Sequence, residues 1–410
     1  MLFDLILVAF SPTDLITNNS PYAVFNNSVE KFNKLRDYKN QNQNLSNVKL
    51  ILSVLLPFND DLMKISPFNN VQNGMYNSTN PVNQQFIGDL IAIVNDFSFD
   101  GIDIDYPNKM PCYQFTFDIN ALNSVFPQFL NDLSNKLKAS NSNKILTITA
   151  GQFNILDIDP DIITFVNILA FRLNINTTRP SAGIGDIQRI INSWSNYIDK
   201  SKLVLGIELG GIIEAITPSH FVRIDIANQN FAILRNQNVT FPSSLIDENI
   251  IDPCKVTSYA HLPWQNLLNL LEPPCYTDTI QSSGWKYGFD NKSQQPYLFQ
   301  RTQLYPINNL KTNYYYISYE DYQSLNAKFD LIRKNNLGGI AIPDITKDYS
   351  QLMNFVSTSS PIQPNNTGAI VGGVLGAVIF VGAMVSVGFM FYRKHRAKIS
   401  DLLKDTKNQT

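Results

Sequence analysis

Seven short apolar segments recur along this chain with helical patterns between them, and this alternation limits the possible folds more than any other feature. The segments are rich in Val, Ile and Leu and have the length of strands: residues 5–10, 48–55, 101–105, 145–150, 166–171, 203–209 and 338–343. The intervening patterns have helical spacing: residues 29–39, 83–96, 120–138, 187–198 and 319–334. Such alternation is typical of a parallel sheet covered by helices. With an eighth strand expected at residues 22–25, we predict an α/β fold, a TIM (β/α)8 barrel.

One interval, residues 218–316, interrupts the alternation. It is rich in proline, aromatic and polar residues. We therefore expect an inserted α+β subdomain, mostly β, within a barrel domain that spans residues 1–356.

Composition excludes several classes of function. The formal net charge is -2 at pH 7, which argues against nucleic acid as a partner. His220, His261 and His395 are scattered without ligand spacing, so we expect neither a metal site nor a cofactor. The three cysteines are too few for a disulfide scaffold; Cys254 and Cys275 either pair in an oxidising compartment or remain unpaired.

Residues 368–392 form one strongly apolar run. These residues carry no charge, and the run exceeds the ~20 residues that cross a bilayer core. It predicts a single C-terminal transmembrane helix after a linker at residues 357–367. Basic residues follow at once, and positive flanks stay cytoplasmic. We therefore expect a cytoplasmic tail at residues 393–410 and an extracellular or lumenal N-terminal domain.

Three further patterns bear on this topology. Gly368, Gly372 and Gly376 have the spacing that permits helix dimerisation in membranes, although glycine is common in such helices. Acceptor motifs for N-glycosylation occur at Asn18, Asn26, Asn44, Asn77, Asn176, Asn238, Asn291 and Asn365. The first ten residues lack the basic region of a signal peptide. We expect either a start internal to a longer gene product or a transmembrane helix that acts as the targeting signal.

Two carboxylates stand on one face of the segment at residues 101–105. Side chains alternate along a strand, so Asp103 and Asp105 share a face with Pro107. Buried carboxylates need partners, and a fold that keeps them usually has a site there. The alternative is that these acids only cap neighbouring loops.

These residues resemble a known family. The segment from Asp100 to Asp105 resembles the fourth-strand signature D-x-x-D-x-D-x-E of glycoside hydrolase family 18, the chitinase family. Residues 202–206, 296–298, 318–328 and 338–342 resemble the family's seventh strand, closing segment and eighth strand, in that order. The resemblance covers residues 1–356 and implies the chitinase-like barrel, with its insertion between strand seven and the following helix.

The resemblance also implies a catalytic acid that this chain lacks. In this family a protonated Glu gives its proton to the leaving oxygen, while an Asp two residues earlier orients the sugar's attacking N-acetyl group. Pro107 stands at the Glu position and cannot donate a proton.

Other family positions have changed as well. Phe171 and Arg172 stand where the family has a Tyr-Asp pair, and Pro343 stands where it has a sugar-binding Trp. Residues 53–56 replace the family's S-x-G-G with bulkier side chains. These departures imply that hydrolytic competence has been lost.

We therefore expect a catalytically inactive, membrane-anchored protein that binds chitin or N-acetylglucosamine-containing glycans. The remaining aspartates either hydrogen-bond a sugar, pair with Arg172 or persist for structural reasons. Trp285 and Tyr297, with Trp264 and Tyr287, are candidates for stacking on sugar rings or are core residues. The alternatives are an active hydrolase with a displaced general acid and a surface interaction module without a glycan ligand.

Overall fold

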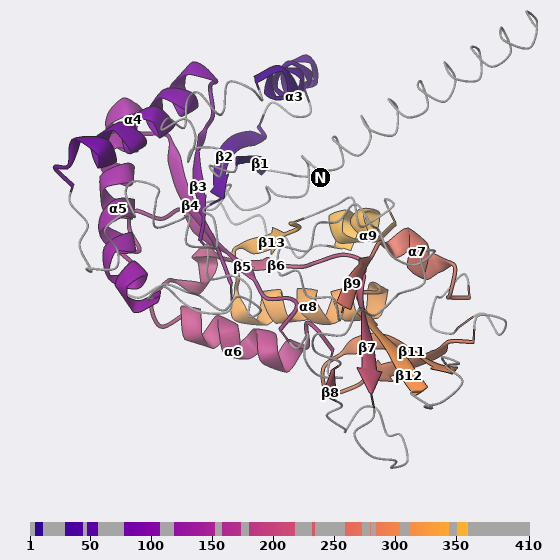
Figure 1. Ribbon diagram of the computed structural model, residues 1–410. Helices are drawn as coiled ribbons and strands as arrows, with labels where there is room; N and C mark the ends of the chain where they lie inside the picture. Colours follow the sequence, from indigo (N-terminus) through magenta and orange to yellow (C-terminus); the bar gives the residue numbers. More distant parts are fainter. Residues whose placement is uncertain are drawn as a thin grey trace, which may run out of the picture.

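Two sheets organise the part of the chain that the structure describes. The structure, a computed structural model, describes residues 5–10, 29–43, 47–55, 78–106, 119–151, 158–173, 180–217, 232–233, 259–272, 279, 284–303, 312–343 and 351–359. One sheet is parallel and curled, and the other is antiparallel and lies beside its C-terminal strands (Figure 1).

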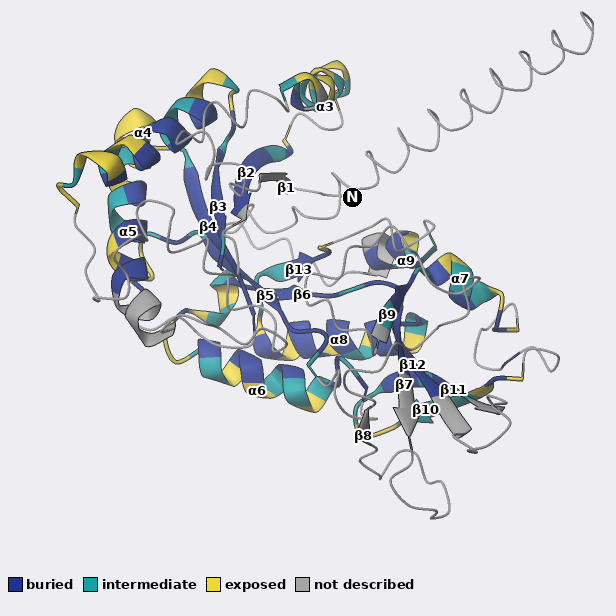
Figure 2. Cartoon of the chain, in the orientation of Figure 1, coloured by how far each residue is buried: buried dark blue, intermediate teal, exposed yellow. Residues whose placement is uncertain are grey.

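The parallel sheet follows the order of the chain. Its seven strands are β1 (Leu5–Phe10), β2 (Lys49–Leu55), β3 (Gly101–Asp105), β4 (Ile145–Ala150), β5 (Phe165–Leu169), β6 (Leu203–Gly206) and β13 (Gly339–Ala341). Every neighbouring pair is parallel. The seven predicted strands are confirmed, with ends that differ by up to three residues. Strands β3 to β6 are buried throughout except at Asp105, as expected for a sheet covered by helices (Figure 2).

Helices cover the outer face of this sheet (Figure 1). They are α3 (Val29–Gln41), α4 (Pro81–Asp96), α5 (Ile119–Ser140), α6 (Ile184–Trp194) and α8 (Tyr322–Asn335), with α9 (Gln351–Ser359) after the last strand. The predicted start of α8 at residue 319 is wrong. The Asp321 side chain accepts a hydrogen bond from the Ser324 N–H, and Ser324 caps the Asp321 backbone in return. This capping box begins the helix at Tyr322.

The second sheet is antiparallel and extends beyond the expected insertion. Its order is β10 (Lys286–Asp290), β11 (Gln295–Gln303), β12 (Thr312–Tyr319), β7 (Gly211–Thr217) and β8 (Ala232–Ile233), and β9 (Tyr259–Leu262) also pairs with β7. A short helix, α7 (Trp264–Leu268), follows β9. The sheet thus starts soon after β6 and ends just before α8, which places it against the carboxyl ends of the last barrel strands.

The expected eighth strand at residues 22–25 stays a prediction. Residues 22–25 lie outside the described residues, but β1 and β2 pair directly from Leu5↔Lys49 to Phe10↔Val54. A strand that falls between them in the sequence therefore cannot lie between them in the sheet.

Several other predictions concern segments outside the described residues. These are the span at residues 368–392 with its three glycines, the tail, the linker from residue 360 onward, Pro107, and the cysteines Cys254 and Cys275. The predicted start of the linker at residue 357 is wrong, because α9 continues to Ser359. In the described ranges, no helix combines the length and apolar character needed to cross a membrane.

Candidate functional site

The interior of the parallel sheet is built in two layers. One is an apolar layer of Ile51, Ile145, Phe165, Val204 and Ala341, and its first four members lie toward the amino ends of their strands. Two residues further along β2, β4 and β5, on the same face, stand polar side chains: Ser53, Thr147 and Asn167. The polar layer therefore lies nearer the carboxyl ends of the strands, where barrels of this kind carry their sites.

Asp103 is the centre of this polar layer. It is fully buried and accepts hydrogen bonds from Thr147 Oγ1 at 2.6 Å, Ser53 Oγ at 2.8 Å and Thr149 Oγ1 at 3.0 Å. Burial raises the pKa of Asp103 to about 6, the nearby charge of Asp105 adds to this rise, and the three hydroxyl groups oppose it. The carboxyl group is thus held by strands on both sides of β3.

The three aspartates of the family motif divide between the two ends of β3. Asp105 stands at the carboxyl end beside Asp103 and is less buried. Asp100 stands before the amino end, where its Oδ2 accepts a hydrogen bond from the Leu50 N–H at 2.8 Å and lies 3.8 Å from Lys39 Nζ. Asp103 and Asp105 therefore belong to one site, and Asp100 joins β3 to β2.

A buried ion pair occupies the end of β5. Arg172 Nε donates to Glu208 Oε2 at 2.8 Å, and its Nη2 donates to Oε1. The guanidinium carbon also lies 5.5 Å from the centre of the Phe171 ring. His261, on strand β9 of the second sheet, places its Nδ1 3.9 Å from Glu208 Oε1. Arg172 reaches this arrangement with φ of 54°, a left-handed conformation that costs a non-glycine residue about 1–2 kcal/mol.

Glu208 was missed by the sequence analysis. It comes two residues after β6, at the same end of the barrel as Arg172. The sequence offered one signal: a charge opposite in sign to that of Arg172, at the end of the neighbouring strand. Parallel strands bring such strand ends together.

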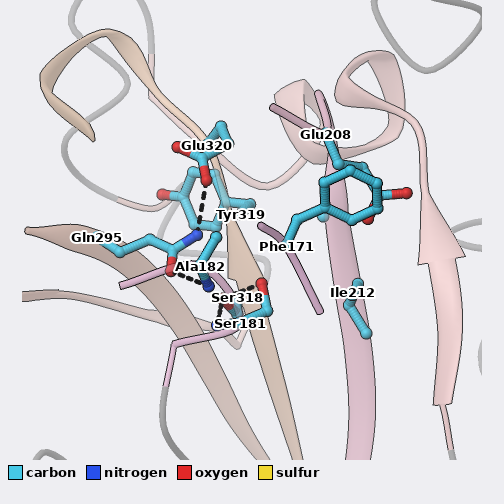
Figure 3. A pocket seen from close by; sticks show the side chains of 11 residues that line it. Phe171, Ser181, Ala182, Glu208, Ile212, Gln295, Ser318, Tyr319 and Glu320 are labelled. Carbon is cyan, nitrogen blue, oxygen red and sulfur yellow. Dashed lines mark hydrogen bonds between the residues drawn. The ribbon is translucent and has the colours of Figure 1, made fainter. Parts of the chain in front are cut away.

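A small hollow lies between this strand end and the second sheet. Its lining includes Phe171, Glu208, Ile212, Gln295, Ser318 and Glu320 (Figure 3). The cavity between these side chains has a volume of about 10 Å³, roughly the space that one water molecule needs. Gln295 bridges it by accepting from the Ala182 N–H at 2.9 Å and donating to Glu320 at 2.8 Å. The hollow is therefore a polar packing junction and is too small for a sugar.

The aromatic candidates are largely packed inside. Trp264 is fully buried and donates to Gln351 at 3.0 Å, and Trp285 is 6% exposed. Tyr297 is partly buried on β11, and its ring centre lies 5.6 Å from that of Tyr316. Tyr297 is thus less buried than the two tryptophans, although its ring also lies over Gly288. Pro343 is exposed just beyond β13.

Comparison with protein families identifies the class. The profile of Glycosyl hydrolases family 18 matches residues 2–348, so the chain belongs to this family.

Solved structures share the fold. An N-acetylglucosaminidase from Paenibacillus barengoltzii has a TM-score of 0.55 at 16% identity, over 79% of this chain and 85% of that chain. A class V chitinase from Nicotiana tobaccum has a TM-score of 0.55 at 16% identity, over 88% of this chain and 93% of that chain. At this identity the likeness concerns the fold alone.

One curated relative matches a short segment. Chitinase ChiA of Flavobacterium johnsoniae is 35% identical over 103 residues, which is 24% of this chain. The match spans 6% of that relative's length.

Proposed function

We propose that this chain is a membrane-anchored, chitinase-like protein that has lost hydrolytic activity and binds chitin or N-acetylglucosamine-containing glycans. The observation that carries the proposal is Pro107 at the position of the family's general acid. A general acid supplies about 10²- to 10⁴-fold in rate, and proline has no proton to give.

The described carboxyl groups near the barrel end are poor substitutes for that acid. Asp103 is held by three hydroxyl groups and has no exposed surface. Both Glu208 oxygens are engaged by the Arg172 guanidinium. Burial raises the pKa of Glu214 well above its usual range, but Glu214 lies inside the second sheet opposite Tyr316. These contacts favour an inactive site over a displaced general acid.

The features that support glycan binding are the retained polar groups of the barrel. Asp105 stands at the carboxyl end of β3 in the position that orients the N-acetyl group in the family. Tyr297 offers part of its ring from the second sheet. The anchor rests on the uncharged run at residues 368–392.

The binding test uses the full chain in detergent and compares chitin beads with cellulose beads. We expect retention on chitin and elution by soluble chito-oligosaccharide. The Asp105→Ala variant should weaken binding about 10- to 100-fold, because a hydrogen bond to a charged group contributes about 1.5–3 kcal/mol. Asp161→Ala, at an exposed position before β5, is the matched control and should bind as the wild type does.

Two results would contradict glycan recognition. One is the absence of retention on chitin, which would leave a surface interaction module without a glycan ligand. The other is equal retention of the wild type and Asp105→Ala, which would place any binding outside the barrel end.

A further inference from the structure

Asn167 is a buried polar residue to which the proposed function gives no role. It lies on β5 in the polar layer of the barrel, and only 1% of its surface is exposed. Its side-chain Oδ1 has no hydrogen-bond partner in the part of the chain that the structure describes. A buried acceptor without a donor costs free energy, and an apolar side chain of similar size would avoid this cost. Packing alone therefore does not explain an asparagine at this position.

The other end of the Asn167 amide begins a chain of hydrogen bonds. Asn167 Nδ2 donates to Thr149 Oγ1 on β4 at 3.0 Å. Thr149 Oγ1 donates in turn to Asp103 Oδ2 on β3, also at 3.0 Å. Strands β3, β4 and β5 are neighbours in the sheet, and Thr149 pairs directly with Asn167 in its register. All three side chains are buried, so bulk water has little access to this chain of hydrogen bonds.

The direction of the amide decides what the Thr149 hydroxyl can do. A hydroxyl group has one proton to donate. Because the Thr149 oxygen accepts from Asn167 Nδ2, its proton is left for Asp103. With the amide reversed, Asn167 Oδ1 would take that proton, and the Asp103 carboxylate would lose one of its three hydroxyl donors. The two ends of the amide are therefore not equivalent for Asp103.

We propose that Asn167 is a positioning residue, which directs the Thr149 hydroxyl toward Asp103 and thereby favours the ionised form of that carboxyl group. Hydrogen bonds in a chain polarise one another, so a hydroxyl that accepts a hydrogen bond is also the stronger donor. Asp103 precedes Asp105 by two residues on the same face of β3. Asn167 thus acts on the charge of the proposed glycan site, but the inference does not depend on whether a glycan binds there.

The other groups around Asp103 do not extend to further residues in this way. Burial and the negative charge of Asp105, on the same strand, both oppose ionisation of Asp103. The neighbouring strands present hydroxyl groups, Ser53 from β2 at 2.8 Å and Thr147 from β4 at 2.6 Å. In the described ranges, neither of these two hydroxyl groups accepts a hydrogen bond from another side chain. Thr149 is therefore the donor through which a more distant residue can act.

The test follows the ionisation of Asp103 through the pH dependence of stability of the full chain. Urea unfolding between about pH 4 and about pH 9 compares each protein with its Asp103→Asn counterpart. Because the folded pKa of Asp103 is raised, the stability difference within a pair falls as pH rises. It levels off near the folded pKa, at a value that we call the plateau pH. In the wild type, the plateau pH should be about 6.

Both members of the chain should move the plateau pH upward. Thr149→Val removes a donor to the ionised form at nearly constant shape and should raise the plateau pH by about one pH unit. Asn167→Leu leaves the Thr149 hydroxyl without its fixed direction and should raise it by a smaller amount. Asn167→Ala should act in the same direction if the leucine does not fit the polar layer. An unchanged plateau pH in the Asn167 variants would overturn the proposal.

Two further variants separate positioning from packing. Thr149→Ser keeps the hydroxyl and should keep the plateau pH of the wild type. Asn167→Leu combined with Thr149→Val should have the same plateau pH as Thr149→Val alone, because Asn167 acts through that hydroxyl. An equal shift with and without the hydroxyl would contradict this route. Chitin binding enters none of these measurements, so a failure of glycan recognition leaves the test intact.

Discussion

Asp103 shows how competing effects set the pKa of a single carboxyl group. Three hydroxyl donors favour the charged carboxylate, yet full burial opposes it more strongly and leaves the pKa at about 6. A carboxyl group with this pKa is partly protonated in mildly acidic conditions. Its role in the described structure is to join β2, β3 and β4 within the polar layer.

The raised pKa of Asp103 predicts a specific pH dependence of stability. Because the folded pKa lies above the usual 3.8, the native state binds the proton more tightly, and this stabilisation is lost as pH rises through about 6. Relative to Asp103→Asn, the wild type should lose up to about 3 kcal/mol between about pH 4 and about pH 7. Urea unfolding at several pH values measures the difference.

The control for this experiment is Asp161→Asn, at an exposed position. Its stability difference from the wild type should change little with pH. A flat difference for Asp103→Asn would show that Asp103 stays ionised throughout this range.

Glycosylation of Asn291 would test whether this domain lies on the lumenal side of the membrane. This residue is exposed in the turn between β10 and β11, with Ser293 completing the acceptor motif. If this domain is lumenal, expression in a eukaryotic secretory host should place a glycan on Asn291. Peptide mass spectrometry after enzymatic deglycosylation should show that Asn291 carried the glycan.

Two variants separate the motif from the fold. Asn291→Gln and Ser293→Ala should both prevent glycosylation at this position. The Ser293→Ala variant keeps the Cβ that packs toward Gly183. An unmodified Asn291 in the wild type, together with modified sites elsewhere in the domain, would contradict access at this turn.

At the scale of elements, a buried ion pair fastens α8 to the second sheet. Lys328 Nζ lies 2.8 Å from Glu320 Oε2, and both side chains are almost fully buried. Ser324 and Gln295 also donate to the Glu320 carboxylate, at 2.7 and 2.8 Å. The pair thus links the end of β12, the first turns of α8 and β11.

Removing the cation should therefore destabilise the fold. Lys328→Met leaves the Glu320 carboxylate buried without its charge partner, so we expect a loss of about 3–5 kcal/mol in the free energy of unfolding. Arg333→Met, which breaks the exposed pair with Asp330 on the same helix, should cost less than about 1 kcal/mol. Similar losses in the two variants by urea unfolding would contradict this role for Lys328.

The sequence predicted β3 and β4 to the residue, and packing explains why. A Cβ on Gly101 would lie 2.1 Å from the Ile145 carbonyl oxygen, so glycine is needed where β3 meets β4. Beyond Gly101, the apolar Ile102 and Ile104 alternate with Asp103 and Asp105. In these strands local pattern and tertiary environment agree.

The second sheet was harder to delimit from the sequence. Its strand β7 pairs with β12 through Gly211↔Tyr319, residues that lie about 100 positions apart. Local periodicity carries no information about such pairing, and Tyr319 reads equally well as the start of a helix. The ion pair of Arg172 with Glu208 was missed for the same reason, because two strand ends had to be brought together first.

At the scale of the whole molecule, the number of barrel strands was easier to predict from the sequence than the order of the strands in the sheet. The alternation of strands and helices identified seven barrel strands, but it assigned the eighth to residues 22–25. Direct pairing of β1 with β2 shows only that no further strand lies between these two in the sheet. Strand order depends on long-range contacts, which the periodicity of one sequence does not contain.

The central claim, a chitinase-like barrel without hydrolytic activity, is tested most directly by turnover of a chromogenic chitobiose substrate by the purified full chain. We predict no hydrolysis above the blank for the wild type or for Pro107→Glu, because Phe171 lacks the hydroxyl of the family's Tyr and Arg172 is bound to Glu208. Activity in Pro107→Glu alone would show that only the acid is missing. Wild-type hydrolysis that Asp105→Ala abolishes would contradict the central claim.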